Sequence, residues 1–133
     1  MRCYRIKFLL INILFINFLE LAFASFPSIL IQNCYDGDTC TTSEGEIIRL
    51  ACIDTPEIKG RNSDLIPALA ARDFVNNLIA NKKVFIKRIT KDKYGRTVAE
   101  LFLGDTNIQE LIVKKGYGKI YRKYADQCPW SKS

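Results

Sequence analysis

The sequence predicts a small α+β domain, mainly β, in which a five-stranded β-barrel carries two or so helices. Three observations favour this fold class. Short apolar runs joined by turn residues dominate the chain after residue 24, and two stretches have apolar residues at helical spacing. The elements follow the order three strands, helix, two strands, helix.

Residues 1–24 predict a targeting segment that is not part of the fold. Residues 1–7 carry three basic side chains and no acid, residues 8–19 are almost wholly apolar, and Ala22-Phe23-Ala24 is a small-x-small pattern. This order is typical of a secretory signal peptide cleaved after Ala24. The alternative is an uncleaved membrane anchor over residues 8–24, which is at the lower length limit for a bilayer span. We therefore expect an exported protein, periplasmic or extracellular, or one anchored by residues 8–24.

Residues 25–133 are expected to form one domain. The whole chain has 133 residues and a net charge of +6, and it contains no histidine. Ser-His and Cys-His catalysis and histidine-based zinc sites are therefore excluded. Catalysis must come from carboxylates, Arg, Lys, Tyr, Ser, Thr or Cys.

Four cysteines remain after residue 24: Cys34, Cys40, Cys52 and Cys128. An even number in an exported chain indicates disulfides, but four cysteines allow three complete pairings and the sequence does not choose among them. The alternative for Cys52, which lies in an apolar run, is a buried free thiol.

Three strands are predicted before the first helix. Residues 29–31 form a short apolar run, residues 39–42 are extended, and residues 47–53 form a second apolar extended run. A turn is expected at residues 43–46, which include Gly45.

A helix, a hairpin and a second helix follow. Residues 67–80 have apolar side chains at helical spacing, with Pro67 in the first turn and Asn81 as the stop. Residues 84–89 and 97–103 predict a β-hairpin around the turn at residues 92–95. Asn107 followed by Glu110 predicts a cap for a helix over residues 108–115, ended by Gly116. This element order is compatible with a barrel of the OB type.

Charge is segregated along the chain. Residues 36–57 contain six acids and one base, Arg49, whereas residues 82–96 contain seven bases and one acid. Residues 114–123 add five bases and no acid. Carboxylates beside basic flanks suit a metal ion held against a polyanion. The alternative is a set of solvated loops and strand edges, where lysines prevent aggregation.

Two acidic motifs lie in the first half of the domain. Asp36-Gly37-Asp38-Thr39 places two carboxylates around a glycine, so both can approach a hard cation, although Asp-Gly is also a common turn signal. Asp54-Thr55-Pro56-Glu57 follows a buried run, and Pro56 stiffens the chain there; the alternative is a helix or loop cap.

Two further features add positive charge. Arg49 is the one base in the acidic segment, and its planar fork favours bidentate contact with a phosphate or a carboxylate. Asp92-Lys93-Tyr94-Gly95-Arg96 places basic and aromatic side chains at a tight turn, with an ordinary charged hairpin as the alternative.

Together and in this order, these motifs resemble the staphylococcal nuclease (thermonuclease-like) family. The resemblance extends from about Cys34 to Tyr124 and includes the helix after the second motif and the segment 113–120. One departure is Arg122, which stands where the family carries an aromatic residue near the nucleotide base. Tyr124, two residues later, matches an aromatic.

The resemblance implies an OB-fold phosphodiesterase that uses Ca²⁺ to cut DNA and RNA and leaves 3′-phosphate ends. It implies that Asp38 and Asp54 are side-chain ligands of Ca²⁺ and that Thr55 contributes its backbone carbonyl. These are the oxygen ligands that Ca²⁺ prefers.

The resemblance also implies the catalytic residues. Arg49 and Arg96 would hold the scissile phosphate, and Glu57 would orient or deprotonate the attacking water. The residues expected to contact the nucleotide are Lys93, Tyr94 and Tyr124.

The expected substrates are DNA and RNA, preferably single-stranded or denatured, and the protein is expected to be a monomer with no obligate protein partner. The alternative function is a nucleic-acid-binding OB module without catalysis. The presence of Arg49, Glu57 and Arg96 together favours the enzyme.

Overall fold

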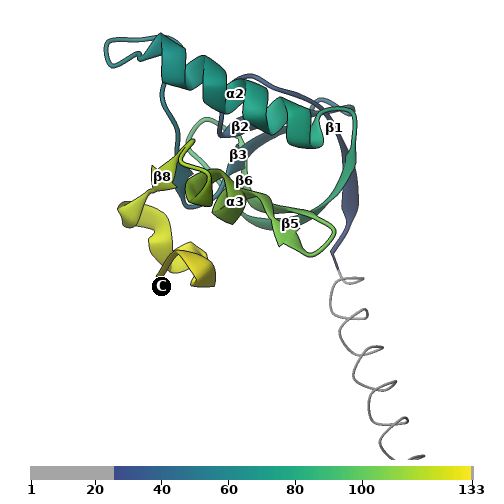
Figure 1. The fold of residues 1–133 in the computed structure, drawn as a ribbon. Helices are drawn as coiled ribbons and strands as arrows, with labels where there is room; N and C mark the ends of the chain where they lie inside the picture. Colours follow the sequence, from purple (N-terminus) through teal and green to yellow (C-terminus); the bar gives the residue numbers. More distant parts are fainter. Residues whose placement is uncertain (1–25, 133) are drawn as a thin grey trace, which may run out of the picture.

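A closed barrel of five strands forms the centre of the protein in the computed structural model, which describes residues 26–132 (Figure 1). The expected signal peptide or anchor, residues 1–24, lies outside the described residues. The barrel strands are β1 (Ser28–Cys34), β2 (Thr39–Thr42), β3 (Ile47–Leu50), β5 (Lys83–Lys91) and β6 (Thr97–Leu103).

The barrel closes through one parallel pairing. The strands lie in the order β3-β2-β1-β5-β6 with antiparallel neighbours, and β3 then pairs with β6 in parallel. The closing register joins Ile48 to Thr97 and Leu50 to Ala99. The predicted α+β class and five-stranded OB-type barrel are therefore confirmed. A short strand, β7 (Thr106–Asn107), extends the sheet beyond β6.

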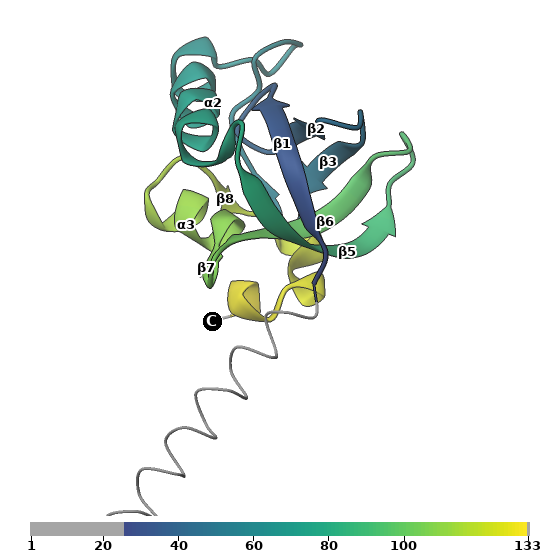
Figure 2. The ribbon, with the colours of Figure 1, turned by 90° about the vertical axis from the view of Figure 1, so that its right-hand side faces the viewer.

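Within residues 26–132, two helices pack against the barrel. Helix α2 (Leu65–Ile79) packs beside β1 (Figure 2), and its buried residues are Ala68, Ala71, Val75 and Ile79. Their spacing places them on one face, and the two alanines let the helix approach the sheet closely. The helix begins two residues before the predicted start, so Pro67 still falls in its first turn. The N–H groups of the first turn have no partner within the helix, so the N–H that proline lacks costs no helical hydrogen bond.

The second helix, α3 (Ile108–Lys114), begins at its predicted cap. The Asn107 side chain accepts a hydrogen bond from the Glu110 backbone N–H at 3.0 Å. Ile108 and Ile112 are fully buried in the same core as Ile31 and Leu101. Within residues 26–132, no helix combines the length and apolar character needed to cross a membrane.

The predicted single strand over residues 47–53 is wrong, because the chain turns at Ala51 and Cys52. Strand β3 ends at Leu50, Cys52 adopts a φ of 66°, and β4 (Ile53–Asp54) starts a separate two-stranded sheet. The Arg49 guanidinium donates hydrogen bonds to the carbonyls of Leu50 and Ile53, at 2.6 and 2.9 Å. These bonds satisfy two backbone oxygens at the break.

The C-terminal residues form a short tail beside the barrel. Strand β8 (Lys119–Ile120) pairs with β4, and two 3₁₀ turns follow, η1 (Arg122–Gln127) and η2 (Pro129–Lys132). None of these elements is predicted by periodicity, because each is too short to show a repeat.

Two disulfides resolve the pairing that the sequence left open. Cys34 pairs with Cys40, closing the loop that carries the first acidic motif. Cys52 pairs with Cys128, joining the break after β3 to the tail over a separation of 76 residues. The free-thiol interpretation of Cys52 is therefore wrong.

Candidate active site

One pocket of about 740 Å³ gathers the sequence-predicted site residues. The acidic loop after β1, the end of β3, β4, the β5–β6 turn and the tail all contribute to its lining. The predicted residues that line it are Asp38, Arg49, Asp54, Glu57, Lys93, Tyr94, Arg96 and Tyr124. Thr55, the remaining predicted residue, is buried beside Asp38 and is not part of the lining.

Asp38 is a buried carboxylate held by several hydrogen bonds. Its Oδ2 accepts from the Thr55 backbone N–H at 3.0 Å, and its Oδ1 accepts from the Thr39 hydroxyl at 3.2 Å. The Asp36 carboxylate accepts from the Asp38 backbone N–H at 3.0 Å, which shapes the loop. Burial raises the pKa of Asp38 to about 6; the positive charge of Arg49 opposes this rise, and the negative charge of Asp36 adds to it. A cation at this carboxylate would offset its desolvation.

Gly37 allows this loop to pack tightly. A Cβ at residue 37 would lie 2.8 Å from the Ala71 Cβ and from both side-chain branches of Thr55. The glycine is therefore required by close approach of the acidic loop to α2 and to Thr55. The sequence argument, which assigned the glycine to cation access, missed this packing role.

Arg49 stands between the two predicted carboxylate ligands. Its Nη2 lies 3.4 Å from Asp38 Oδ2 and 3.9 Å from Asp54 Oδ1. Its Nη1 and Nη2 also donate to the Leu50 and Ile53 carbonyls, and these bonds fix the guanidinium. An arginine held in this way is oriented before any ligand arrives, and it keeps further N–H groups for an anion.

Glu57 is exposed at the edge of the same cluster. Burial of part of its carboxyl raises its pKa, and the negative charges of Asp38 and Asp54 add to the rise. The positive charges of Arg49 and Arg96 lower it. The charges of these four side chains therefore reach the Glu57 carboxyl.

The β5–β6 turn presents Arg96 on a fixed support. Asp92 Oδ2 accepts from Arg96 Nε at 2.7 Å, and Asp92 Oδ1 accepts from the backbone N–H groups of Tyr94 and Arg96 at 2.9 Å. Burial acts to raise the pKa of Asp92, but these hydrogen bonds together hold it below its usual value. Lys93 and Arg96 both lie over the Tyr94 ring, at 5.0 and 5.4 Å from its centroid.

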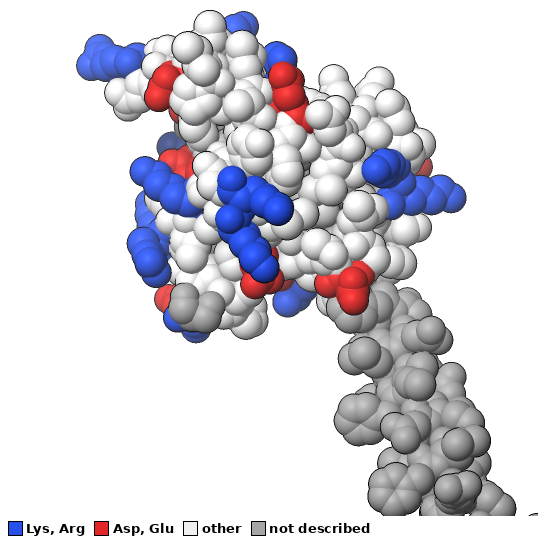
Figure 3. All heavy atoms as spheres, in the orientation of Figure 1, with Lys and Arg blue, Asp and Glu red and all other residues white. Residues whose placement is uncertain are grey.

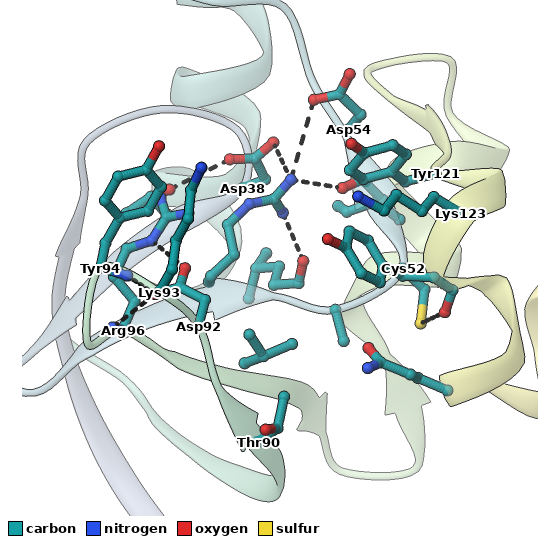
Figure 4. Close-up of a pocket in the computed structure, with 18 of the residues that line it drawn as sticks. Asp38, Cys52, Asp54, Thr90, Asp92, Lys93, Tyr94, Arg96, Tyr121 and Lys123 are labelled. Carbon is teal, nitrogen blue, oxygen red and sulfur yellow. Dashed lines mark hydrogen bonds and ion pairs between the residues drawn. The ribbon is translucent and has the colours of Figure 1, made fainter.

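The tail supplies the facing side of the pocket, which sequence reasoning recovered only at Tyr124. Figure 4 shows Tyr94 and Lys93 on one side and Tyr121 and Lys123 on the other. The Tyr121 and Tyr124 rings pack edge to face with centroids 5.0 Å apart, and Lys123 Nζ lies 5.2 Å from the Tyr124 centroid. The two basic residues between two tyrosines over 121–124 are the signal that could have found them.

Basic side chains also gather on the face of the molecule that carries α3 and β8. Figure 3 shows Lys and Arg side chains gathered over α3, β8 and the start of the tail. The basic residues in this part of the sequence are Lys114, Lys115, Lys119, Arg122 and Lys123. Arg122 lines a neighbouring hollow next to β8 and is absent from the main pocket.

The pocket fits a hard cation through its donor chemistry. Within residues 26–132, no group of three or more Asp, Glu or Cys side chains forms a ready metal cluster. Asp38 and Asp54 nonetheless both lie near the Arg49 head group, and the Thr55 backbone N–H bonds the Asp38 carboxylate. Carboxylate oxygens of this kind suit a cation like Ca²⁺, which readily completes its coordination with water.

The chain is similar to known nucleases. The family model described as staphylococcal nuclease homologue matches residues 47–132. A thermonuclease from Staphylococcus intermedius is 35% identical over 98 residues, covering 69% of this chain and 58% of the relative. A thermonuclease from Staphylococcus hyicus is 34% identical over 95 residues, covering 65% and 56%. Endonuclease YncB from Bacillus subtilis is 27% identical over 113 residues, covering 75% and 54%.

The chain spans a little over half the length of these three relatives. The family model nevertheless covers most of the described domain, including Arg49, Glu57, Arg96 and the tail. On this match and on the OB-type barrel, the chain belongs to the staphylococcal nuclease family.

Proposed function

We propose that the protein is an exported, Ca²⁺-dependent nuclease that hydrolyses phosphodiester bonds of DNA and RNA to 3′-phosphate products. The observation that carries this proposal is the meeting of Arg49, Glu57 and Arg96 at one pocket that also contains Asp38 and Asp54. Relatives named thermonuclease and endonuclease support the same reaction class.

The two arginines are suited to hold a phosphodiester group. Arg49 is fixed by two backbone carbonyls, and Arg96 is fixed by Asp92. Negative charge grows on the phosphoryl oxygens as water attacks. Guanidinium groups oriented in advance stabilise that charge without reorganising during the reaction.

Glu57 is suited to act on the attacking water. Its carboxyl is exposed to the pocket, and its raised pKa makes its carboxylate a stronger base than a fully solvated one. In the proposed reaction it orients the water or accepts its proton, and the leaving oxygen departs from the phosphorus on the opposite side.

The proposed ligands of the cation are Asp38, Asp54 and the backbone carbonyl of Thr55. When bound, Ca²⁺ supplies positive charge beside the phosphoryl oxygens and thereby lowers the energy of the transition state. Asp38 and Asp54 hold negative charge there, and Gly37 lets the loop carrying Asp38 pack close to Thr55.

The substrate in this proposal is a single-stranded or denatured nucleic acid. Tyr94, which is 72% exposed, and Tyr124 offer faces on which unpaired bases stack, and Lys93 offers charge for a backbone phosphate. We propose a monomer that works without a protein partner. Two disulfides support export, because such bonds persist in oxidising compartments.

Cleavage of denatured DNA and of RNA by the purified protein tests this proposal, with reactions in Ca²⁺ and in excess chelator. We expect cleavage only with Ca²⁺, giving ends that require a phosphatase before they can be extended. Binding of nucleic acid without cleavage in either condition would instead establish a non-catalytic binding module.

A further inference from the structure

We propose that the Cys52–Cys128 disulfide positions the substrate-binding side of the pocket. It holds residues 121–127, here called the tail segment, so that nucleic-acid affinity depends on the oxidised bond. The rate of the chemical step does not depend on it. This inference rests on the proposed function only in taking nucleic acid as the ligand of the pocket.

The tail segment has little attachment of its own. None of the residues of η1 is buried. The preceding strand, β8, pairs with β4 through only two residue pairs, Ile53 with Ile120 and Asp54 with Lys119. Short 3₁₀ turns have poor hydrogen-bond geometry and are weak elements by themselves. The segment therefore needs an anchor beyond its local structure.

Cys52 connects directly to both aromatic residues of the tail segment. The Tyr121 backbone N–H donates to the Cys52 carbonyl at 2.8 Å, and Cys52 Sγ lies 3.3 Å from the Tyr124 carbonyl oxygen. Cys52 itself lines the pocket (Figure 4), and Cys128 is fully buried at the end of η1. The covalent bond thus ties the far end of the segment to the residue that its near end already contacts.

The tail segment contributes binding groups and no catalytic group. Tyr121 and Tyr124 are 38% and 40% exposed, and Lys123 lines the pocket beside them. The proposed catalytic residues lie elsewhere, on β3, after β4 and on the β5–β6 turn. Loosening the segment should therefore weaken binding while leaving the arrangement of Arg49, Glu57 and Arg96 unchanged.

Residues beyond Cys128 keep the end of the chain on the barrel without the disulfide. Trp130 Nε1 donates to the buried Glu100 carboxylate of β6 at 2.8 Å, and Trp130 packs against the barrel core. The buried Ser131 hydroxyl contacts the Ala125 and Cys128 carbonyls within the tail itself. Loss of the disulfide should thus loosen residues 121–127 without unfolding the domain.

The chemistry of the bond is reversible. Two thiols lose two protons and two electrons when the disulfide forms, and a partner disulfide accepts them by exchange and becomes a dithiol. A dithiol reductant drives the reverse step. The tail segment would then be held in an oxidising compartment and released in a reducing one.

Binding measured without cleavage tests the inference most directly. A labelled single-stranded oligonucleotide is titrated in chelator with the oxidised protein and with C52S/C128S. The expected result is a Kd raised by about tenfold or more, the scale of losing a stacked base. The matched control is C34S/C40S, which also lacks one disulfide but keeps the tail segment, and whose Kd should stay within about twofold.

Kinetics in Ca²⁺ separate this role from a general structural one. For C52S/C128S, KM should rise by a similar factor while kcat stays within about threefold. Should that variant fold poorly, Tyr121→Leu in the oxidised protein should raise KM in the same way. Trypsin should also cut the reduced parent at Arg122 or Lys123 faster than the oxidised one.

The outcomes distinguish the two proposals. Equal Kd for the oxidised protein and C52S/C128S overturns the inference, as does a fall in kcat at unchanged KM or the absence of binding by the oxidised protein. Disulfide-dependent binding without Ca²⁺-dependent cleavage overturns the nuclease proposal and supports the positioning role.

Discussion

Arg96 and Asp92 form a closed pair across one turn of the β5–β6 hairpin. Asp92 Oδ2 accepts from the Arg96 side chain at 2.7 Å, while its Oδ1 accepts from the Arg96 backbone at 2.9 Å. The same carboxylate therefore shapes the turn and aims the guanidinium. The turn is therefore a rigid support for Arg96, the residue proposed to bind the phosphate.

The Asp92→Asn variant should separate these two roles. Asparagine suits the turn and keeps one oxygen that accepts from the backbone N–H groups. It also replaces the negatively charged oxygen opposite Arg96 Nε by part of a neutral amide. We expect kcat to fall by roughly tenfold to a hundredfold from misplacement of Arg96. The matched control is Asp105→Asn in the exposed turn after β6, which should leave kcat unchanged. Parental kcat in Asp92→Asn would show that Arg96 needs no such support.

Replacing Arg49 by lysine should damage the reaction although the charge is kept. Lysine cannot bond the Leu50 and Ile53 carbonyls while also presenting a planar fork to a phosphate. By analogy with the loss of one oxyanion donor, kcat should fall by about 10²- to 10³-fold. The control for steady-state rates is Arg88→Lys, because Arg88 lies on β5, outside the pocket, and bonds Glu46. A kcat within about threefold of the parent for Arg49→Lys would contradict the assigned role.

A methyl group at residue 37 should destabilise the fold. The added Cβ of Gly37→Ala would meet the Ala71 Cβ and the Thr55 side chain at 2.8 Å, so backbone must shift. Overpacking of this kind costs about 1–3 kcal/mol in the free energy of unfolding. Urea titration checks the prediction, with a lower midpoint at unchanged slope. An unchanged midpoint would mean that the acidic loop is not packed as described.

The Glu46–Arg88 pair should make stability depend on pH. Hydrogen bonds from Arg88 lower the pKa of Glu46 below its usual value, with a further contribution from the Thr97 hydroxyl. Because the folded pKa is depressed, the stabilisation is present above the unfolded pKa and is lost as pH falls through the folded one.

The test of this pair compares unfolding of Glu46→Gln with the parent across pH. At pH 7 the variant should be less stable by about 1 kcal/mol, since the partners are partly exposed, and the difference should vanish below about pH 3. Glu44→Gln, at an exposed position of the same turn, should show no such trend. A difference that is constant with pH would contradict an ionic origin.

Local patterns predicted much of the barrel. Strand β6 was predicted to the residue, because it lies between the turn at Gly95 and the turn at Gly104. The Asn107 cap and the buried face of α2 were likewise visible as short-range signals. The break after β3 was not, because the positive φ of Cys52 and the Arg49 bonds around it depend on tertiary contacts.

The candidate site was inferred from motifs at strand ends and turns through the resemblance to a nuclease family, and the structure brings Asp38, Arg49 and Arg96 from these motifs to one pocket. Tyr121 reaches the pocket only because the chain returns after α3 and is tied to Cys52. A sequence with three open disulfide pairings could not specify that return.

The most direct test of the account compares the parent with Glu57→Gln in two assays on the same denatured DNA. The substitution keeps the size of the side chain but removes the carboxylate that would orient or deprotonate water. The account predicts Ca²⁺-dependent cleavage by the parent, a fall of at least about 10²-fold in kcat for the variant, and an affinity within a few-fold of the parent. Equal cleavage rates for the two proteins would contradict the assignment of this pocket as the place where hydrolysis occurs.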